Sequence, residues 1–295
     1  QKAYRILFLS DQHAHTDIQA GFMRYGEVGK SDVVVYAGDN MWDGFHAESG
    51  RGLFDDFIDC AVEHHAREIP AVFVRGNHEW SGRYSNAWMR LLRTRDNTTY
   101  YTFRHGGVFY IVLDSGNCTK GNLFNHVEQI FRDQREWLIN EVLPSEEFRS
   151  ATFRVVITHM STHGQSDGAS QQLMRQYFMD LLNRTEPHAR IHLMLAGHVH
   201  RYMRVDPHSR ACKVFPHNYD GRQSPAVTGE EFNYTVVSND GPTCGGVEAT
   251  LIIMDVTPDK LVLQTLGPDG TRIDAFSIDR EGRVTDDMPV PEYPY

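Results

Sequence analysis

The chain has 295 residues, 40% of them hydrophobic and 23% charged, and its formal net charge is -10. A chain of this length and composition can bury a sizeable core, and it contains no apolar run of about eighteen residues that would predict a transmembrane helix. The acidic balance argues against long nucleic acids as partners, because Lys and Arg supply most of the affinity for a phosphate backbone.

From Tyr4 to Gly197 the sequence alternates between strand-like and helix-like segments. Short apolar runs predict buried strands at 6–10, 33–37, 71–74, 155–158 and 192–196. Apolar residues at helical spacing predict helices at 17–23, 53–62, 128–143 and 170–183. This alternation indicates parallel strands that are covered by helices.

The remaining segments predict a second sheet. Strand-like runs on either side of Gly106-Gly107 predict a hairpin at 100–114 that starts this sheet. Further runs at 234–237, 249–256, 261–266 and 272–278 predict antiparallel strands that close it. We expect irregular structure at 218–228 and in the tail, 281–295. The economical interpretation is one domain over 1–295, in which about 1–200 carries the functional loops and about 201–280 the closing strands.

Each of the five predicted strands between 6 and 196 is followed, within three residues, by Asp, His or Asn. The candidate ligands are Asp11, His13, Asp39, Asn77, His159, His198 and His200. Because the carboxyl ends of parallel strands lie at one edge of a sheet, we expect these side chains to converge there. Carboxylate, imidazole and amide oxygen without thiolate suit iron, manganese or zinc, so this pattern favours a metal site over incidental turn residues.

These residues carry a resemblance to a known family. In chain order, Asp11-x-His13, Gly38-Asp39, Gly76-Asn77-His78-Glu79, His159 and Gly197-His198-x-His200 resemble the motifs of the calcineurin-like metallophosphoesterases. The resemblance implies the α/β class: a four-layer α/β/β/α sandwich of two mixed sheets flanked by helices. It also implies a dinuclear metal site at the C-terminal edge of the strands.

The resemblance assigns roles to the candidate residues. One metal ion would take Asp11, His13, Asp39 and His200, and the other would take Asp39, Asn77, His159 and His198. Two divalent or mixed-valence ions of Mn, Fe or Zn, roughly 3.5–4 Å apart, can activate a hydroxide and hold phosphate oxygens. The histidine of the Gly-Asn-His motif is not a ligand in this family, so His78 would protonate the leaving oxygen or stabilise the transition state.

Two further motifs resemble the purple acid phosphatase branch: Gln134-x-x-Trp137-Leu138, and the run from Gly197 to Tyr202. Three positions depart from family patterns. Purple acid phosphatases have a residue other than histidine at the position of His13, and a metal-binding Tyr at the position of Trp42, so the tyrosinate-to-iron charge transfer is not expected. Asp43 lies one residue beyond the Gly-Asp-x-x-Asp spacing, so it is not given the role of supporting the catalytic histidine.

The resemblance implies a hydrolase of a small phosphate ester, and a phosphomonoesterase is favoured. A phosphodiesterase of cyclic or small nucleotide diesters is the alternative, and a non-catalytic metal-binding scaffold is the alternative of another class. His163 is the candidate substrate contact, because its loop begins at His159.

The sequence says less about compartment and assembly. The start at Gln1 rather than Met slightly favours a secreted or periplasmic protein, and the oligomeric state is left open. Cys60 is expected in a helix core, and one disulfide among Cys118, Cys212 and Cys244 is an open alternative.

Overall fold

The computed structural model describes residues 3–41, 55, 58–81, 85, 98–117, 127–163, 169–215, 229–239, 241, 249–288 and 293–294. The predictions made for Trp42, Asp43, Cys118, Cys244 and the stretch 218–228 lie outside these residues. Within the described part, no helix has the length and apolar character needed to cross a bilayer.

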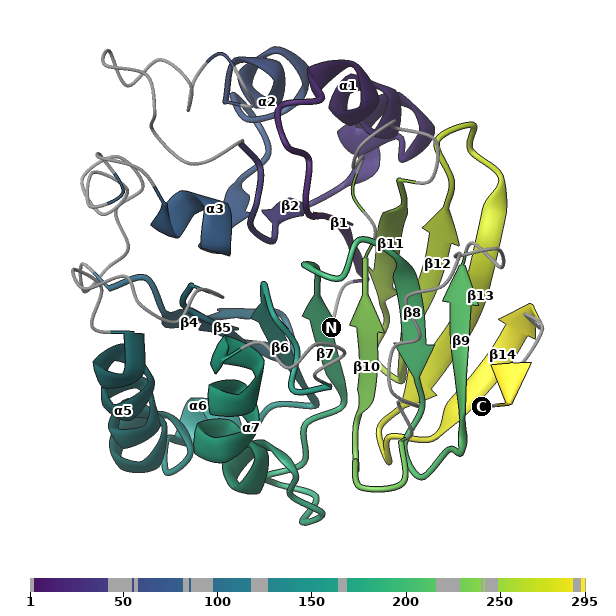
Figure 1. Ribbon diagram of the computed structural model, residues 1–295. Coiled ribbons are helices and arrows are strands. Elements are labelled where there is room, and N and C mark those ends of the chain that lie inside the picture. Colours follow the sequence, from purple (N-terminus) through teal and green to yellow (C-terminus); the bar gives the residue numbers. More distant parts are fainter. Residues whose placement is uncertain are drawn as a thin grey trace.

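Two mixed β-sheets form the centre of the molecule (Figure 1). The first has the strand order β14-β13-β12-β11-β1-β2-β3, and the second has the order β15-β9-β8-β10-β7-β6-β5-β4. The strands of the first sheet are β1 (Tyr4–Leu9), β2 (Val33–Tyr36), β3 (Ala71–Phe73), β11 (Leu251–Val256), β12 (Lys260–Leu266), β13 (Arg272–Asp279) and β14 (Val284–Met288). Those of the second are β4 (Tyr101–His105), β5 (Val108–Leu113), β6 (Phe153–Thr158), β7 (Leu193–Ala196), β8 (Tyr202–Val205), β9 (Ala211–Phe215), β10 (Thr235–Ser238) and β15 (Tyr293–Pro294).

Helices cover the outer faces of both sheets (Figure 1). The α-helices are α1 (Thr16–Tyr25), α2 (Asp59–His64), α3 (Asn77–Trp80), α5 (Val127–Trp137), α6 (Glu146–Arg149) and α7 (Ala169–Leu182). A 3-10 turn at Val28–Lys30 follows α1, and a π-helical turn at Leu138–Val142 continues α5 towards Pro144. Of the predicted helix at 53–62, the structure describes only the end, as part of α2.

The core has the two-residue period of buried strands. In β1, Ile6 and Phe8 face the second sheet in the central core, whereas Leu7 and Leu9 pack under α1 with Phe22. The outer face of the second sheet is buried in the same way, beneath α5 and α7. The result is the predicted four-layer α/β/β/α sandwich of two mixed sheets.

The prediction for the C-terminal strands is wrong in one respect. β11, β12 and β13 extend the first sheet instead of closing the second, because β11 pairs antiparallel with the free side of β1, Leu7 opposite Ile253. This pairing buries both faces of β11, with Ile252 in the central core and Leu251 beneath α1. Of the predicted group, only β10 joins the second sheet, where it runs parallel to β7.

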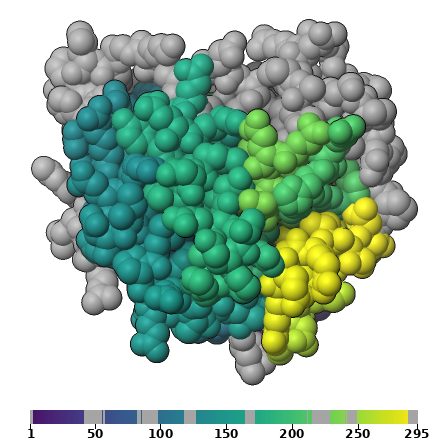
Figure 2. All heavy atoms as spheres, turned by 90° about the horizontal axis from the view of Figure 1, so that it is seen from below, coloured from purple at the N-terminus to yellow at the C-terminus, as the bar shows by residue number. Residues whose placement is uncertain are grey.

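The tail is also more regular than predicted. β14 pairs with β13, and β15 pairs with β9, so the chain end adds strands to both sheets. At this end of the molecule, His192 before β7 donates from Nε2 to the Arg280 carbonyl at 3.0 Å. Figure 2 shows the C-terminal strands of the first sheet, in yellow, lying against the green segment that leads to β7. Cys212 lies buried in β9, and both Cys212 and Cys60 are free thiols.

Candidate metal centre

Sharp backbone turns follow the strands that carry the candidate ligands. Asp11 and Asp39, in the loops after β1 and β2, have φ of 56° and 51°, and His13 has φ of 43°. His198 and His200, after β7, have φ of 73° and 49°. Left-handed backbone costs a non-glycine residue of the order of 1–3 kcal/mol and concentrates at functional sites. Five of the seven candidate ligands are therefore held in a conformation that only the surrounding structure can maintain.

Glycines allow these turns to touch one another. A Cβ on Gly197 would lie 2.3 Å from Asp11 Oδ2, and a Cβ on Gly38, where φ is +90°, would lie 2.7 Å from His159 Nδ1. Such distances are too short for any other residue, so each glycine permits the backbone of one loop to lie against a side chain of another.

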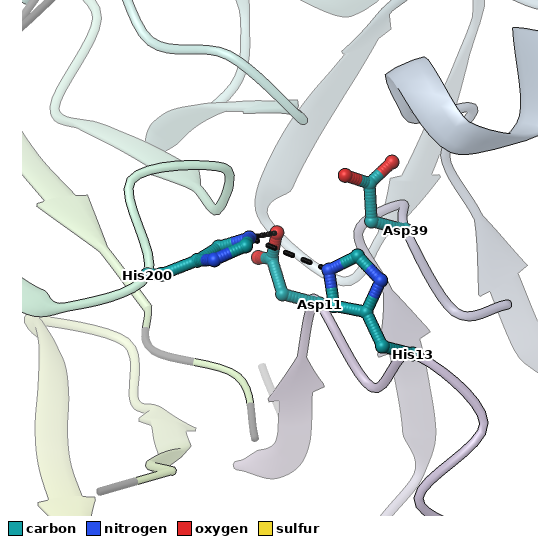
Figure 3. A group of neighbouring side chains, drawn as sticks. All are labelled: Asp11, His13, Asp39 and His200. Carbon is teal, nitrogen blue, oxygen red and sulfur yellow. Dashed lines mark hydrogen bonds and ion pairs between the residues drawn. The ribbon is translucent and has the colours of Figure 1, made fainter. Parts of the chain in front are cut away.

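The structure brings the seven candidate ligands together. The ligand atoms of Asp11, His13, Asp39 and His200 all lie within 4.8 Å of one another (Figure 3). Those of Asp39, His159 and His198 form a second group within the same limit. Asn77 joins the second group, since its Oδ1 lies 3.1 Å from His159 Nε2. Asp39 belongs to both groups, as a bridging ligand must.

The charges of this cluster favour a bound cation. Asp11 and Asp39 are buried, and among the described residues their ionic partners are histidines: His159 Nε2 lies 3.1 Å from Asp39 Oδ2, and His200 Nε2 lies 3.2 Å from Asp11 Oδ1. Burial raises the pKa of both carboxyls, but the neighbouring imidazoles, His159 foremost, outweigh it and hold each pKa below its usual range. Both carboxylates are therefore ionised at neutral pH.

The imidazoles differ in protonation. Burial lowers the pKa of His13 and of His198 to about 4, so these rings are neutral at neutral pH. His198 Nδ1 is buried and has no hydrogen-bond partner within the described part of the chain. Burial also opposes a charge on His159, but Asp39 and Asp11 outweigh it and raise the pKa of His159 to about 10. Two buried carboxylates, imidazoles that bind a cation in their neutral form and an amide oxygen fit a pair of divalent metal ions.

Glu79 holds the loop after β2 against the loop after β3, a role that the sequence did not reveal. Its buried carboxylate accepts from the backbone N–H groups of Gly76, Asp39 and Asn40, each at 2.8 Å. Burial and the nearby Asp39 charge raise the pKa of Glu79. The motif Gly-Asn-His-Glu contained the residue, but its contacts with Asp39 and Asn40 span about 40 positions and leave no local pattern.

His78 lies beside the cluster and is more exposed than the ligands. Its backbone N–H donates to Asp39 Oδ1 at 2.8 Å, and its Nε2 lies 3.8 Å from Asp39 Oδ2. The His78 side chain is 22% exposed, against 1% for Asp39. His78 belongs to neither ligand group, and its partial exposure leaves the ring able to meet a substrate.

His163 is placed differently from what a substrate contact requires. Its ring is 1% exposed and stacks on Phe232, with the ring centroids 3.5 Å apart. Burial, together with the nearby Arg175, lowers the pKa of His163 to about 3. This placement gives no support to a substrate contact, and the role of His163 stays a prediction.

Comparisons with known proteins agree with this geometry. The family model described as calcineurin-like phosphoesterase matches residues 4–202. No curated protein matches the chain significantly.

Among solved structures, the purple acid phosphatase PPD1 of yellow lupin (Lupinus luteus) is similar with a TM-score of 0.63 and 13% identity, over 96% of this chain and 55% of the lupin chain. The chain thus spans about half the length of the lupin enzyme. GAP50 of Plasmodium, the anchor in the inner membrane complex, is similar with a TM-score of 0.64 and 13% identity, over 95% and 89%. A dimetal phosphatase of Danio rerio has a TM-score of 0.55 and 12% identity, over 94% and 99%. At such identities these structures share the fold.

Proposed function

The chain belongs to the calcineurin-like phosphoesterase family, and we propose that it is a two-metal hydrolase of small phosphate esters, with phosphomonoesters as the favoured class. The observation that carries the proposal is the position of Asp39 in both ligand groups. A carboxylate shared by two sites can hold two cations at the short separation that phosphoryl transfer uses.

The geometry supports the roles that we propose for the candidate residues. Asp11, His13, Asp39 and His200 would hold one ion, and Asp39, Asn77, His159 and His198 the other. When bound, the two ions supply the activated water and neutralise charge on the phosphate oxygens.

His78 lies beside these ligands with its ring partly exposed, where it can donate a proton to the leaving oxygen of a bound ester. Its orientation is fixed at the backbone, by the bond from its N–H to Asp39 Oδ1.

The preference for monoesters is supported by sequence features. The motifs around Gln134 and from Gly197 to Tyr202 resemble those of phosphatases, and the net charge of -10 disfavours large polyanions. The test is the initial rate on p-nitrophenyl phosphate against bis-p-nitrophenyl phosphate with manganese, iron, zinc or no metal. We expect metal-dependent turnover with the monoester preferred. A preference for the diester would identify a phosphodiesterase instead.

The likeness to GAP50, described as an anchor, makes a non-catalytic scaffold the second candidate. His78→Ala separates the two, because loss of a general acid lowers kcat by roughly 10²–10⁴-fold without removing a ligand. We expect this variant to retain two metal ions and lose most turnover. The control is His188→Ala, which changes an exposed histidine in the turn before β7 and should retain both the metal ions and the turnover. Wild-type protein that purifies without metal and shows no turnover would support the scaffold.

A further inference from the structure

The end of β5 contributes no ligand to either group, yet it contacts two of the loops that do. Asp114 and Ser115 follow β5 and are fully buried. Asp114 Oδ1 accepts from the indole N–H of Trp80 at 2.8 Å, and Ser115 Oγ accepts from the backbone N–H of Met160 at 3.1 Å. Trp80 ends the helix that carries Asn77, and Met160 directly follows His159.

The helix in question, α3, needs outside support. It spans only Asn77–Trp80, and a single helical turn is not stable alone. Glu79 and Asp39 hold its first residues through the N–H groups of Gly76 and His78. The Trp80–Asp114 hydrogen bond holds its other end. Both ends of the short helix that presents His78 are thus fixed by buried carboxylates.

The Trp80 ring itself is fixed in place. The Arg75 guanidinium lies 3.8 Å above the ring centroid, and Arg75 Nη2 donates to the Ser85 carbonyl at 3.1 Å. This stacking restrains the plane of the indole, so its N–H is aimed at Asp114.

Asp114 is restrained from the other side by α5. Gln134 Nε2 donates to the Asp114 carbonyl at 2.9 Å, and the Asp114 N–H donates to Gln134 Oε1 at 2.8 Å. Gly116 N–H adds a second hydrogen bond to Asp114 Oδ1, also at 2.8 Å. The carboxylate therefore has little freedom to follow a displaced indole.

The Trp80–Asp114 bond also joins the two sheets. α3 follows β3 of the first sheet, whereas Asp114 follows β5 of the second. The ligand loops are divided in the same way, since Asp39 and Asn77 follow first-sheet strands and His159 follows β6 of the second sheet. This hydrogen bond between the sheets therefore sets the distance from His78 to the second-sheet ligands. A misplacement of about 1 Å can cost roughly a hundredfold in rate.

We propose that the hydrogen bond from Trp80 to Asp114 positions His78 against the second-sheet ligands, which makes Trp80 and Asp114 positioning residues for the reaction. This inference rests on the proposed function. It adds a structural role for the Gln134 motif, which clamps the backbone of Asp114.

Three variants test the bond. Trp80→Phe removes the donor and keeps an aromatic ring for Arg75 to cover. Asp114→Leu removes the acceptor at similar volume. Asp114→Asn is the matched control, because its amide oxygen can replace Oδ1, while its NH2 group takes the place of Oδ2, which has no hydrogen-bond partner among the described residues.

We expect Trp80→Phe and Asp114→Leu each to lower kcat on phenyl phosphate about tenfold or more, with KM and the content of two metal ions unchanged. Asp114→Asn stays within about twofold of wild type, and the double variant Trp80→Phe/Asp114→Leu is no slower than the slower single variant. The loss is smaller on 2,4-dinitrophenyl phosphate, whose leaving group needs no proton from His78. Equal losses on the two esters, additive losses in the double variant, or loss of metal would overturn the proposal.

A second readout does not depend on turnover. In the zinc-loaded protein, the ring NMR signals of His78, assigned by their loss in His78→Ala, shift in Trp80→Phe and stay in place in Asp114→Asn. Unchanged His78 signals in Trp80→Phe would overturn the positioning role. Wild-type protein that hydrolyses neither ester would instead contradict the proposed function, and the spectra would still decide whether the bond positions His78.

Discussion

Two charge clusters join the sheets of this protein, and they are built differently. The first is the candidate metal centre at the C-terminal ends of the strands. The second, here called the ion-pair cluster, consists of Arg204 and Lys213 from the second sheet, Asp274 and Asp286 from the first, and Asp206 after β8. Arg204 Nη1 lies 3.1 Å from Asp274 Oδ2, and Lys213 Nζ lies 2.7 Å from Asp286 Oδ1.

The difference lies in the source of positive charge. A buried carboxylate is costly unless a charge partner and hydrogen bonds compensate it. In the ion-pair cluster, the permanent cations of Arg204 and Lys213 provide this compensation. Around Asp11 and Asp39, the described residues offer imidazoles and backbone N–H groups but no Lys or Arg. The first cluster thus leaves room for cations from solution, and the second is complete without them.

The largest effect that would sharpen this contrast is expected for Asp39→Asn. The substitution keeps the shape and the acceptor for the His78 N–H, but it removes the negative charge shared by both groups. We expect kcat/KM to fall by roughly a thousandfold or more, about 4 kcal/mol, and the content of bound metal to drop below two ions. Elemental analysis and steady-state kinetics measure both quantities.

The control for that variant lies in the other cluster. Asp286→Asn also removes a carboxylate charge between the sheets, but it leaves every candidate ligand in place. Its metal content and kcat/KM should stay within about twofold of wild type, because distant sites act independently. Full metal content and activity in Asp39→Asn would contradict this difference between the two clusters, since Asp39 would then have a structural role only, like Asp286.

Arg204→Met should have the next largest effect, this time on stability. Loss of the guanidinium leaves Asp274 buried beside Tyr202 without its main cation, although Lys213 still pairs with Asp286. Removing one partner of a buried pair costs about 3–5 kcal/mol, so we expect the free energy of unfolding in urea to fall by about 3 kcal/mol. Metal content should not change.

Arg210→Met is the matched control for Arg204→Met. Arg210 pairs with Glu230 at the surface, where its side chain is 88% exposed, and its loss should change the free energy of unfolding little. Similar unfolding curves for Arg204→Met and Arg210→Met would show that the ion-pair cluster does not stabilise the joined sheets.

The sequence predicted those features that depend on residues close together in the chain. The candidate ligands could be found because each lies in the loop after one of five strands, and parallel strands bring their ends to one edge. Asp11 and Asp39 therefore lie where the motifs indicated. The helices α1, α5 and α7 were likewise predicted from local periodicity.

The features that the sequence did not reveal depend on distant partners. Apolar alternation marked β11 as a strand but could not tell that β1, about 250 residues away, would be its neighbour. The contacts of Glu79 with Asp39 and of Trp80 with Asp114 have no local pattern either. Arg204 is a charged residue in a buried strand, and its partners Asp274 and Asp286 lie about 70–80 positions away. Local sequence therefore predicts which segments form strands, but not which strands and side chains become neighbours.

The smallest predicted effect is a pH dependence confined to the candidate metal centre. The pKa of His159 is raised from 6.5 to about 10, because Asp39 and Asp11 outweigh burial. In the metal-free protein its protonated ring thus contributes stability that is fully present below pH 6.5 and lost as the pH rises through about 10. A cation must displace this proton, so we expect metal affinity to rise about tenfold per pH unit between about pH 6 and 8.

Calorimetry in buffers of different ionisation enthalpy counts the protons released when zinc or manganese binds. Arg204→Met should release the same number as wild type, because the ion-pair cluster contains no group that metal binding discharges. A metal affinity that is constant over this range, without proton release, would contradict the assignment of His159 as a ligand. The contrast between the clusters would then rest on Asp11 and Asp39 alone, whose carboxylates have histidine partners but no Lys or Arg among the described residues.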